Sequence, residues 1–342
     1  MKFAFITDTH FGVYKSSEVF LKSQLKFFNE QFIPYLEDNN INTIVFGGDI
    51  FDTRSSINVK IINSVYNLFE SLKDFKIYVI IGNHDIYYKT TTEVHSLKFL
   101  KKFNNVTVIE DFTEIENMLL VPWQVDEDKF NEYIINNKIQ KDICIGHFDI
   151  NGFKQTKYQE SKEGFSIKIF DRFKKVFSGH FHLRDEKKKG DVDFIYTGAP
   201  YHLDRNDIDT DKGFCIIDSE TLEYEFVNNN KSIKYIRIDY PSELNKNDIE
   251  DNIVDVYVNY NDEYDEVEFK KFITELDKFK PLESNIKLIN NFLSGEESND
   301  LDNYDLTNIE NIIKEYVNNL DVKQKNEIEK TMFDLYEQCK EI

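Results

Sequence analysis

The sequence predicts an α/β fold in which helices cover a largely parallel sheet. Strand-like apolar runs lie at residues 3–6, 43–46 and 76–81. Two stretches of helical spacing separate them, at residues 19–35 and 59–72. This β-α-β-α-β order favours parallel pairing, because each helix returns the chain to the start of the next strand. In such sheets, binding and catalytic groups gather beyond the carboxyl ends of the strands.

Further strand signals extend the first domain to about residue 230. They lie at residues 118–122, 142–145, 175–178, 194–196, 213–218 and 223–228. The last two flank a Ser-Glu-Thr turn and therefore predict a hairpin. The chain has 342 residues, more than the roughly 250–300 at which single cores stop growing. We therefore expect one large domain, residues 1–230, followed by smaller units.

The segment 231–293 fits a small α+β domain. Strand-like runs lie at residues 233–238, 253–258 and 286–292. Between the last two, apolar side chains recur at helical spacing from Phe269 to Phe279. Residues 294–303 are acidic and rich in Gly, Ser and Asn, so we expect a linker there.

Two amphipathic helices are expected in residues 304–342. The first carries an apolar face made of Ile309, Ile312, Ile313, Tyr316, Val317 and Leu320. The second aligns Ile328, Met332, Leu335, Tyr336 and Cys339. Such a pair after an acidic linker has two interpretations: it packs back on its own domain, or it docks to a partner protein. The sequence leaves both open.

Composition limits the class of partner and the compartment. The net charge of −21 argues against a general polyanion binder, which usually carries a basic stripe. Any nucleic-acid contact must then be local, helped by metal ions or shared with a basic partner. The three cysteines are far apart, which excludes a disulfide framework and a C-x-x-C zinc site and favours a reduced, cytoplasmic setting. No apolar run approaches the roughly 20 residues of a membrane span.

Five short polar motifs each follow a strand signal. They are Asp8-Thr9-His10, Gly47-Gly48-Asp49-Ile50-Phe51-Asp52, Gly82-Asn83-His84-Asp85, Gly146-His147 and Gly179-His180-Phe181-His182. Residues i and i+2 beyond a strand point the same way, so such pairs could share a metal ion. Imidazole and carboxylate ligands without thiolate suit Mn, Fe or Zn. A carboxylate such as Asp49 could bridge two ions about 3.5–4 Å apart, the spacing used in phosphoryl transfer.

Each motif taken alone is weak, because an Asp-x-His is more often a capped turn and a buried His more often satisfies a core hydrogen bond. Their joint occurrence is informative: five of the seven histidines lie in these motifs. The other two are His95, for which we expect a packing role, and His202, for which a place beside the site is the less favoured interpretation.

The ordered set D-x-H, GD-x-x-D, GNHD, GH and GH-x-H resembles the calcineurin-like metallophosphoesterase superfamily. The segments GGDIFDTR, VPW (121–123), GHFDINGF (146–153), SGHFH and YTGAP (196–200) further resemble the nuclease subunit of SbcCD-type repair complexes. The likeness is greatest to the small bacteriophage version, which works with an SMC-like ABC ATPase. The resemblance implies a β-sandwich flanked by helices, and it covers residues 1–220 most strongly.

The resemblance also implies roles for the motif residues. One ion would be held by Asp8, His10, Asp49 and His182. The second would be held by Asp49, Asn83, His147 and His180. His84 would bind no metal and would instead stabilise charge on the phosphate or protonate the leaving 3′-oxygen. The expected cofactors are two divalent ions, with Mn preferred.

The other units resemble known elements by layout. Residues 231–293 are similar to a DNA-capping domain, and residues 304–342 to the element that binds the coiled coil of the ATPase. A homodimer through the early helices is also implied. Many relatives carry His where Asp52 stands, so strand preference cannot be transferred, and we expect Asp52 to support the site rather than to bind metal.

Basic side chains near the motifs are candidates for phosphate contacts. They are Arg54, Lys89 and Arg205, with Lys187, Lys188 and Lys189 as a further run. A lysine run is, however, more often a solvated loop.

The resulting expectation is a Mn-dependent DNA exonuclease or endonuclease that acts with an SMC-like ABC ATPase in recombination, end resection and double-strand break repair. The first alternative is another calcineurin-like phosphodiesterase or phosphatase acting on small phosphoesters. Protein phosphatases of the superfamily read GD-x-VDRG and GNHE, whereas here Thr53-Arg54 follow Asp52 and the third motif ends in Asp85. The second alternative, a non-enzymatic scaffold, is disfavoured because no ligand of the set is missing.

Overall fold

The computed structural model describes residues 1–88, 90–259 and 265–289, and in the terminal region residues 317, 325, 328 and 330–333. By internal contacts, Met1–Val258 with Asp265–Lys287 form one unit, and Asn259–Tyr264 with Leu288–Ile342 form another. The predicted linker 294–303 and most of the predicted helical pair 304–342 lie outside the described residues. Of that terminal region, the described residues are helical and Val317 is buried.

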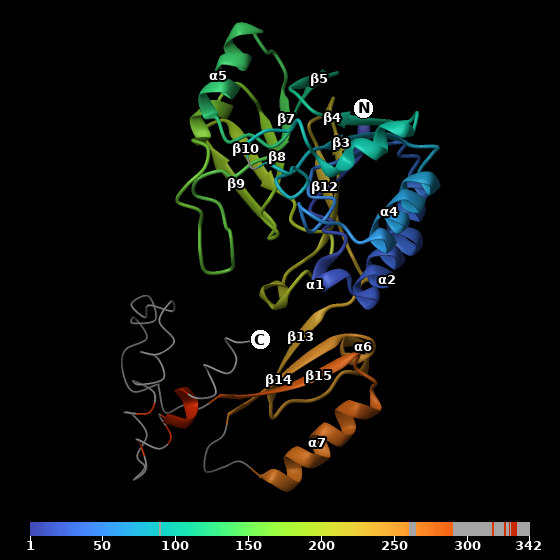
Figure 1. Ribbon diagram of the computed structural model, residues 1–342, viewed down its shortest axis with the longest axis vertical. Helices are drawn as coiled ribbons and strands as arrows, with labels where there is room; N and C mark the ends of the chain where they lie inside the picture. Colours follow the sequence, from blue (N-terminus) through green and yellow to red (C-terminus); the bar gives the residue numbers. More distant parts are fainter. Residues whose placement is uncertain are drawn as a thin grey trace. The chain divides into compact units, whose positions relative to one another are not determined.

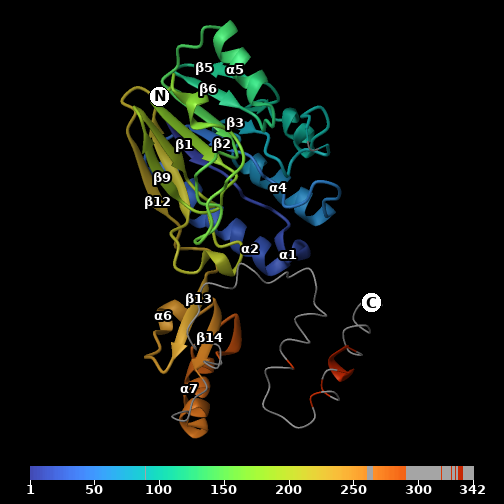
Figure 2. The same cartoon turned by 90° about the vertical axis from the view of Figure 1, so that its left-hand side faces the viewer.

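The first sheet contains the three strands predicted at the N-terminus. Its six strands are, in spatial order, β12 (Tyr224–Asn228), β11 (Gly213–Asp218), β1 (Lys2–Ile6), β2 (Thr43–Phe46), β3 (Lys76–Ile80) and β4 (Val106–Ile109). Strands β1, β2 and β3 pair in parallel, as predicted, and β4, which was not predicted, continues the parallel order. β11 returns antiparallel beside β1, with Phe3 opposite Ile217. The carboxyl ends of β1, β2 and β3 therefore meet at one edge of the sheet, of which Figure 1 labels β3, β4 and β12 and Figure 2 labels β1 and β2.

The second sheet also has six strands. In spatial order they are β5 (Thr113–Ile115), β6 (Met118–Val121), β7 (Ile143–His147), β8 (Lys175–Gly179), β10 (Val192–Tyr196) and β9 (Asp185–Lys189). β6, β7, β8 and β10 are parallel neighbours. The lysine run 187–189, expected as a solvated loop, instead lies in β9 and pairs antiparallel with β10. Charged side chains are tolerated there because β9 is an edge strand.

The two sheets pack face to face and form the β-sandwich that the sequence led us to expect. Alternation along β1 explains how: Phe3 and Phe5 enter a core shared with Ile145 and Phe177 of the second sheet. Ala4 and Ile6, between them, face the opposite way and enter a separate core with the helices. Both sides of the first sheet are therefore buried, which fits its continuous apolar strands.

Helices cover the outer faces of both sheets (Figure 2). Against the first sheet lie α2 (Glu18–Phe27), a π-helical turn (Phe28–Phe32), α3 (Ile33–Asp38) and α4 (Val59–Ser71), after the short α1 (Val13–Ser16). Against the second lies α5 (Glu127–Asn136), whose Phe130 and Ile134 are buried. Short 3-10 helices occur at Ser96–Lys102, Ile167–Phe170 and Arg205–Asp207.

A third, three-stranded sheet has the order β13 (Tyr235–Tyr240), β14 (Ile253–Asn259) and β15 (Glu283–Ile289). With its helices it is called the small domain below, and by internal contacts it belongs to the same unit as the sandwich up to Lys287. Its helices are α6 (Lys246–Ile249) and α7 (Glu266–Lys278), the latter capped by the Asp265 side chain. The Tyr240 ring lies 5.0 Å from the rings of both Phe269 and Phe272, which packs α7 against β13. The helix predicted from the spacing of apolar residues between Phe269 and Phe279 is therefore confirmed as α7.

Candidate metal centre

The five polar motifs converge at one edge of the sandwich. β1, β2 and β3 bring their motifs from the first sheet, and β7 and β8 bring theirs from the second. The backbone is unusual at this edge, because Asp8, His10, Asp49 and His180 all have positive φ angles, between 41° and 92°. Side-chain-bearing residues rarely adopt this conformation, and such strain concentrates at functional sites.

Glycine is required where the loops approach each other most closely. A Cβ on Gly48, whose φ is +105°, would lie 2.5 Å from Nδ1 of His147. A Cβ on Gly179 would lie 2.0 Å from Oγ1 of Thr7. The glycines that precede the motif residues therefore permit the close approach that the sequence suggested.

One group of donors comes from β1 and β8. The Nε2 atoms of His10 and His182 lie 3.1 Å apart, and Oδ1 of Asp8 lies 4.0 Å from each of them. Burial, together with the charge of His10, lowers the pKa of His182 well below its usual value, so its imidazole is neutral. A neutral imidazole is the form that binds a metal ion.

A second group of donors lies beside the first. The amide oxygen of Asn83 is 2.9 Å from Nε2 of His147 and 3.0 Å from Nδ1 of His180. Burial lowers the pKa of His180 to about 3, and the charge of His147 adds to the effect. Burial is the largest single effect on His147 and lowers its pKa, but the carboxylates of Asp49 and Asp8 and the hydrogen bond to Gly47 together raise it to about 9.

Asp49 lies between the two groups. Its Oδ2 atom is 3.7 Å from Nε2 of His10 and 3.3 Å from Nε2 of His147. Its Oδ1 atom accepts a 2.7 Å hydrogen bond from the backbone N–H of His84. Asp8 is also close to both groups, since its Oδ1 is 4.0 Å from Nε2 of His147.

The donor set fits divalent metal ions. Asp8 and Asp49 are both buried, and two buried carboxylates are costly unless cations compensate them. Carboxylate, imidazole and amide oxygen are ligands for Mn, Fe or Zn. All eight residues assigned to the centre from the sequence, the seven candidate ligands and His84, lie in this cluster or directly against it.

His84 and Asp52 form a separate arrangement at the rim. Nδ1 of His84 lies 2.6 Å from the backbone oxygen of Asp52, so Nδ1 carries the proton and Nε2 stays available. The carboxylate of Asp52 lies 3.5 Å from Nδ1 of His10. Asp52 thus contacts two site histidines without belonging to either donor group.

Sequence reasoning left the roles of several supporting residues unassigned. The buried Asp85 carboxylate accepts hydrogen bonds from the N–H groups of Gly82 and Ile50, at 2.9 and 3.1 Å, and so ties two motif loops together. Burial and the charge of Asp49 raise the pKa of Asp85 to about 7. The Trp123 ring lies 5.0 Å from that of His180 and forms a wall of the site. Trp123 could have been identified from the sequence, because it lies in the VPW segment at residues 121–123.

The candidate phosphate contacts are placed differently from one another. Arg54 is partly exposed and has no ion-pair partner among the described residues, whereas Lys89 lies outside them. The Arg205 guanidinium is already paired, because Nε donates to Asp255 at 2.7 Å.

The two histidines outside the motifs contact other parts of the chain. Nδ1 of His202 accepts a hydrogen bond from the backbone N–H of Tyr235 in the small domain, at 3.1 Å. Nδ1 of His95 accepts from the N–H of Leu97 and so caps a short helix.

A sandwich of this topology with a His, Asp and Asn cluster at its edge defines a class of metal-dependent phosphodiesterases, and the chain is an enzyme of this class. It belongs to the calcineurin-like phosphoesterase family, whose family model matches residues 1–236. No helix in the described part of the chain is long and apolar enough to cross a membrane.

Three curated relatives are similar over most of the chain. Exonuclease subunit 1 of Enterobacteria phage T4 is 29% identical over 329 residues, which cover 93% of this chain and 92% of the relative. The DNA double-strand break repair protein Mre11 of Nanoarchaeum equitans is 26% identical, covering 74% and 76%. One subunit of the nuclease SbcCD from Staphylococcus epidermidis is 22% identical, covering 64% and 66%.

Proposed function

We propose that this chain is a DNA nuclease that hydrolyses phosphodiester bonds with two divalent ions, Mn being the expected metal. The observation that carries the proposal is the position of Asp49, whose single Oδ2 atom faces both His10 and His147. A carboxylate that faces two groups of donors is suited to bridging two ions. Two of the three relatives are named as nuclease subunits and the third as a DNA double-strand break repair protein, which supports DNA as the substrate class.

The donor positions support the two groups of ligands that the resemblance implies. Asp8, His10, Asp49 and His182 would hold one ion. Asp49, Asn83, His147 and His180 would hold the other. When bound, the ions would supply Lewis-acid activation of water and of the scissile phosphate.

The chain's own residues would then handle the proton and the substrate. His84 reaches the rim with Nδ1 held by the Asp52 carbonyl, which fixes the ring and leaves Nε2 to stabilise the phosphate or protonate the leaving 3′-oxygen. Asp49 accepts from the His84 N–H, so the acid and the bridging carboxylate keep a constant separation. Trp123 shields His180 from water on one side.

DNA must approach a chain whose net charge is −21. Two bound divalent ions would add four positive charges at the site, which locally offsets the negative charge of the chain. Arg54 and Lys89 are the proposed phosphate contacts, and Arg205 remains a prediction although its guanidinium pairs with Asp255. A basic partner would supply further attraction.

The partner proposed is an SMC-like ABC ATPase, bound by residues 304–342, for which two helices are predicted from the sequence. Residues 231–293 are proposed to cap the DNA. We also propose a homodimer through the early helices. The phage relative points to the cytoplasm of an infected host cell as the place of action.

The experiment is a nuclease assay on single- and double-stranded DNA with Mn, with and without the ATPase. We expect Mn-dependent cleavage that EDTA abolishes and Asp49→Asn eliminates. Hydrolysis of small phosphodiesters with no cleavage of either DNA would favour the small-phosphoester alternative and overturn the DNA assignment.

A further inference from the structure

A buried ion pair lies directly behind the metal ligand candidate His182. The Lys212 side chain is 3% exposed, and its ammonium pairs with Oδ1 of Asp207 at 2.5 Å. The same ammonium donates a 2.6 Å hydrogen bond to the backbone oxygen of His182. Lys212 is 30 positions from His182 in sequence and belongs to none of the five motifs.

The backbone at His182 is held from a second side. The N–H of Ala199 donates to the same oxygen at 3.1 Å. The turn that presents Ala199 contains Gly198, whose φ is +72° and whose added Cβ would lie 2.7 Å from that oxygen. With two donors on one carbonyl, the orientation of the His182 peptide depends on where Lys212 lies.

Asp207 fixes the other end of this contact in a tight turn. Its Oδ2 atom accepts from the backbone N–H groups of Leu203 and Asp204, at 2.7 and 3.2 Å. Asp204 and Asp207 also form a reciprocal capping box around the short helix Arg205–Asp207. This helix is therefore rigidly joined to Lys212.

Arg205, in the same helix, reaches the small domain. Its Nε and Nη2 donate to the two oxygens of Asp255 in β14, at 2.7 and 3.3 Å. Asp255 is buried and also accepts from Lys287 of β15 at 2.6 Å. A bidentate pair of this kind fixes orientation as well as distance.

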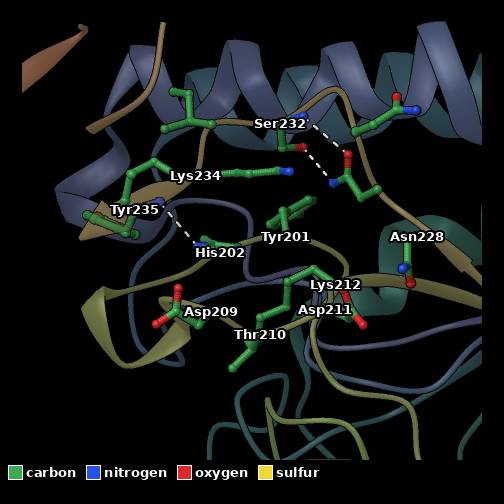
Figure 3. A pocket seen from close by; sticks show the side chains of 14 residues that line it. Tyr201, His202, Asp209, Thr210, Asp211, Lys212, Asn228, Ser232, Lys234 and Tyr235 are labelled. Atoms are coloured by element: carbon green, nitrogen blue, oxygen red, sulfur yellow. Dashed lines mark hydrogen bonds between the residues drawn. The ribbon is translucent and has the colours of Figure 1, made fainter. Parts of the chain in front are cut away.

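Packing around these contacts is incomplete. A cavity of about 490 Å³ lies beside them, lined by Lys212 on one side and by Lys234 and Tyr235 of the small domain on the other (Figure 3). The apolar cluster at the junction is small and contains Ile208, Tyr235 and Ile253 among its buried members. Named polar contacts therefore carry much of the connection between the small domain and the residues behind His182.

We propose that residues 203–212 couple the small domain to the metal centre, with Lys212 and Arg205 acting as positioning residues for His182. The path runs from Asp255 through Arg205, Asp207 and Lys212 to the His182 backbone. This coupling rests on the proposed function in one respect, namely that His182 binds an ion. Whatever stabilises the Arg205–Asp255 pair then strengthens ion binding at the His10–His182 side.

The first test is the substitution Lys212→Met, which keeps the length of the side chain and removes its charge. We expect Mn affinity at one of two sites to fall by about tenfold or more, the usual loss when a partner of a ligand is removed. The other site should keep its affinity. Calorimetric Mn titration measures both, and electron paramagnetic resonance should show a mononuclear signal where the unsubstituted protein shows a coupled pair.

Lys141→Met is the matched control. Lys141 also donates to a backbone oxygen, that of Glu116 at 2.6 Å, and pairs with a carboxylate, that of Glu114 at 3.3 Å. It lies before β7, outside the path, and its loss should leave both Mn affinities unchanged. General destabilisation would weaken both sites together, whereas the proposed role weakens one.

The second test uses the far end of the path, so that a folding defect in Lys212→Met does not leave the proposal untested. Arg205→Gln and Asp255→Asn should each weaken the same Mn site by about threefold or more, and the double variant should weaken it no further. The control is Arg237→Gln, which removes a similar pair with Asp239 inside the small domain.

The outcomes separate the inference from the proposed function. If the unsubstituted protein binds no second Mn, the two-ion assignment fails. If it binds two and the Lys212 and Arg205 variants bind them equally well, the two-ion site stands and the coupling is wrong.

Discussion

The Nε2 atoms of His10 and His182 face each other at 3.1 Å, although one residue follows β1 of the first sheet and the other follows β8 of the second. Neither sheet alone therefore supplies both imidazoles of this group of donors. Packing of Phe5 against Phe177 between the sheets, with ring centroids 6.3 Å apart, is part of what brings the two imidazoles together. The stability of the sandwich and the geometry of the site are therefore linked.

Removal of Phe177 tests this link. Phe177→Ala deletes a fully buried ring from the core between the sheets, and we expect a loss of about 3–5 kcal/mol in the free energy of unfolding. Urea denaturation measures it. Tyr158→Ala is the control, because that side chain is 97% exposed and its loss should change stability by no more than about 0.5 kcal/mol. Equal stabilities of the two variants would contradict the packing account.

His84→Ala tests the proposed acid. We expect Mn binding to be kept, since His84 belongs to neither donor group, while DNA cleavage falls by about 10²–10⁴-fold. His95→Ala serves as control, because that imidazole pairs with Glu110 instead, at 2.8 Å. The proposed role would be wrong if the His84 variant cleaved DNA at the unsubstituted rate.

His202 predicts a pH dependence at the junction with the small domain. Burial lowers the pKa of His202 to about 4, with the charge of Lys212 contributing, so the neutral ring is favoured in the folded state. This stabilisation is fully present above the unfolded pKa of about 6.5 and is lost as pH falls towards 4. Protonation would also remove the acceptor for the Tyr235 N–H.

The measurement compares unfolding free energies of the unsubstituted protein and His202→Gln between pH 7 and pH 4. The advantage of the unsubstituted protein should shrink by on the order of 3 kcal/mol over this range. A constant difference would show that His202 titrates alike in the folded and unfolded states.

Deletion of residues 304–342 tests the partner-binding element. We expect the truncated chain to lose capture of the ATPase while retaining Mn-dependent hydrolysis of a generic phosphodiester, because every candidate ligand lies before residue 183. Undiminished capture would favour the alternative in which residues 304–342 pack on their own domain.

Sequence patterns predicted that the motif residues come together, because each ligand candidate directly follows an apolar run and strand ends of parallel sheets meet at one edge. Contacts between distant segments were not predictable in the same way. The pairing of β11 with β1 joins residues more than 200 positions apart, and periodicity does not specify a partner strand. β4 is only four residues long and was not predicted. Lys212 was not predicted, because it contacts the backbone oxygen of His182 and a side-chain motif does not identify such a contact.

The most direct test of the two-ion centre is the number and coupling of bound Mn ions, measured by calorimetry and electron paramagnetic resonance. The position of Asp49 between His10 and His147 predicts two ions per chain with an exchange-coupled signal, and Asp49→Asn should abolish the coupling. A single uncoupled ion in the unsubstituted protein, or coupling that persists in Asp49→Asn, would contradict the bridging role.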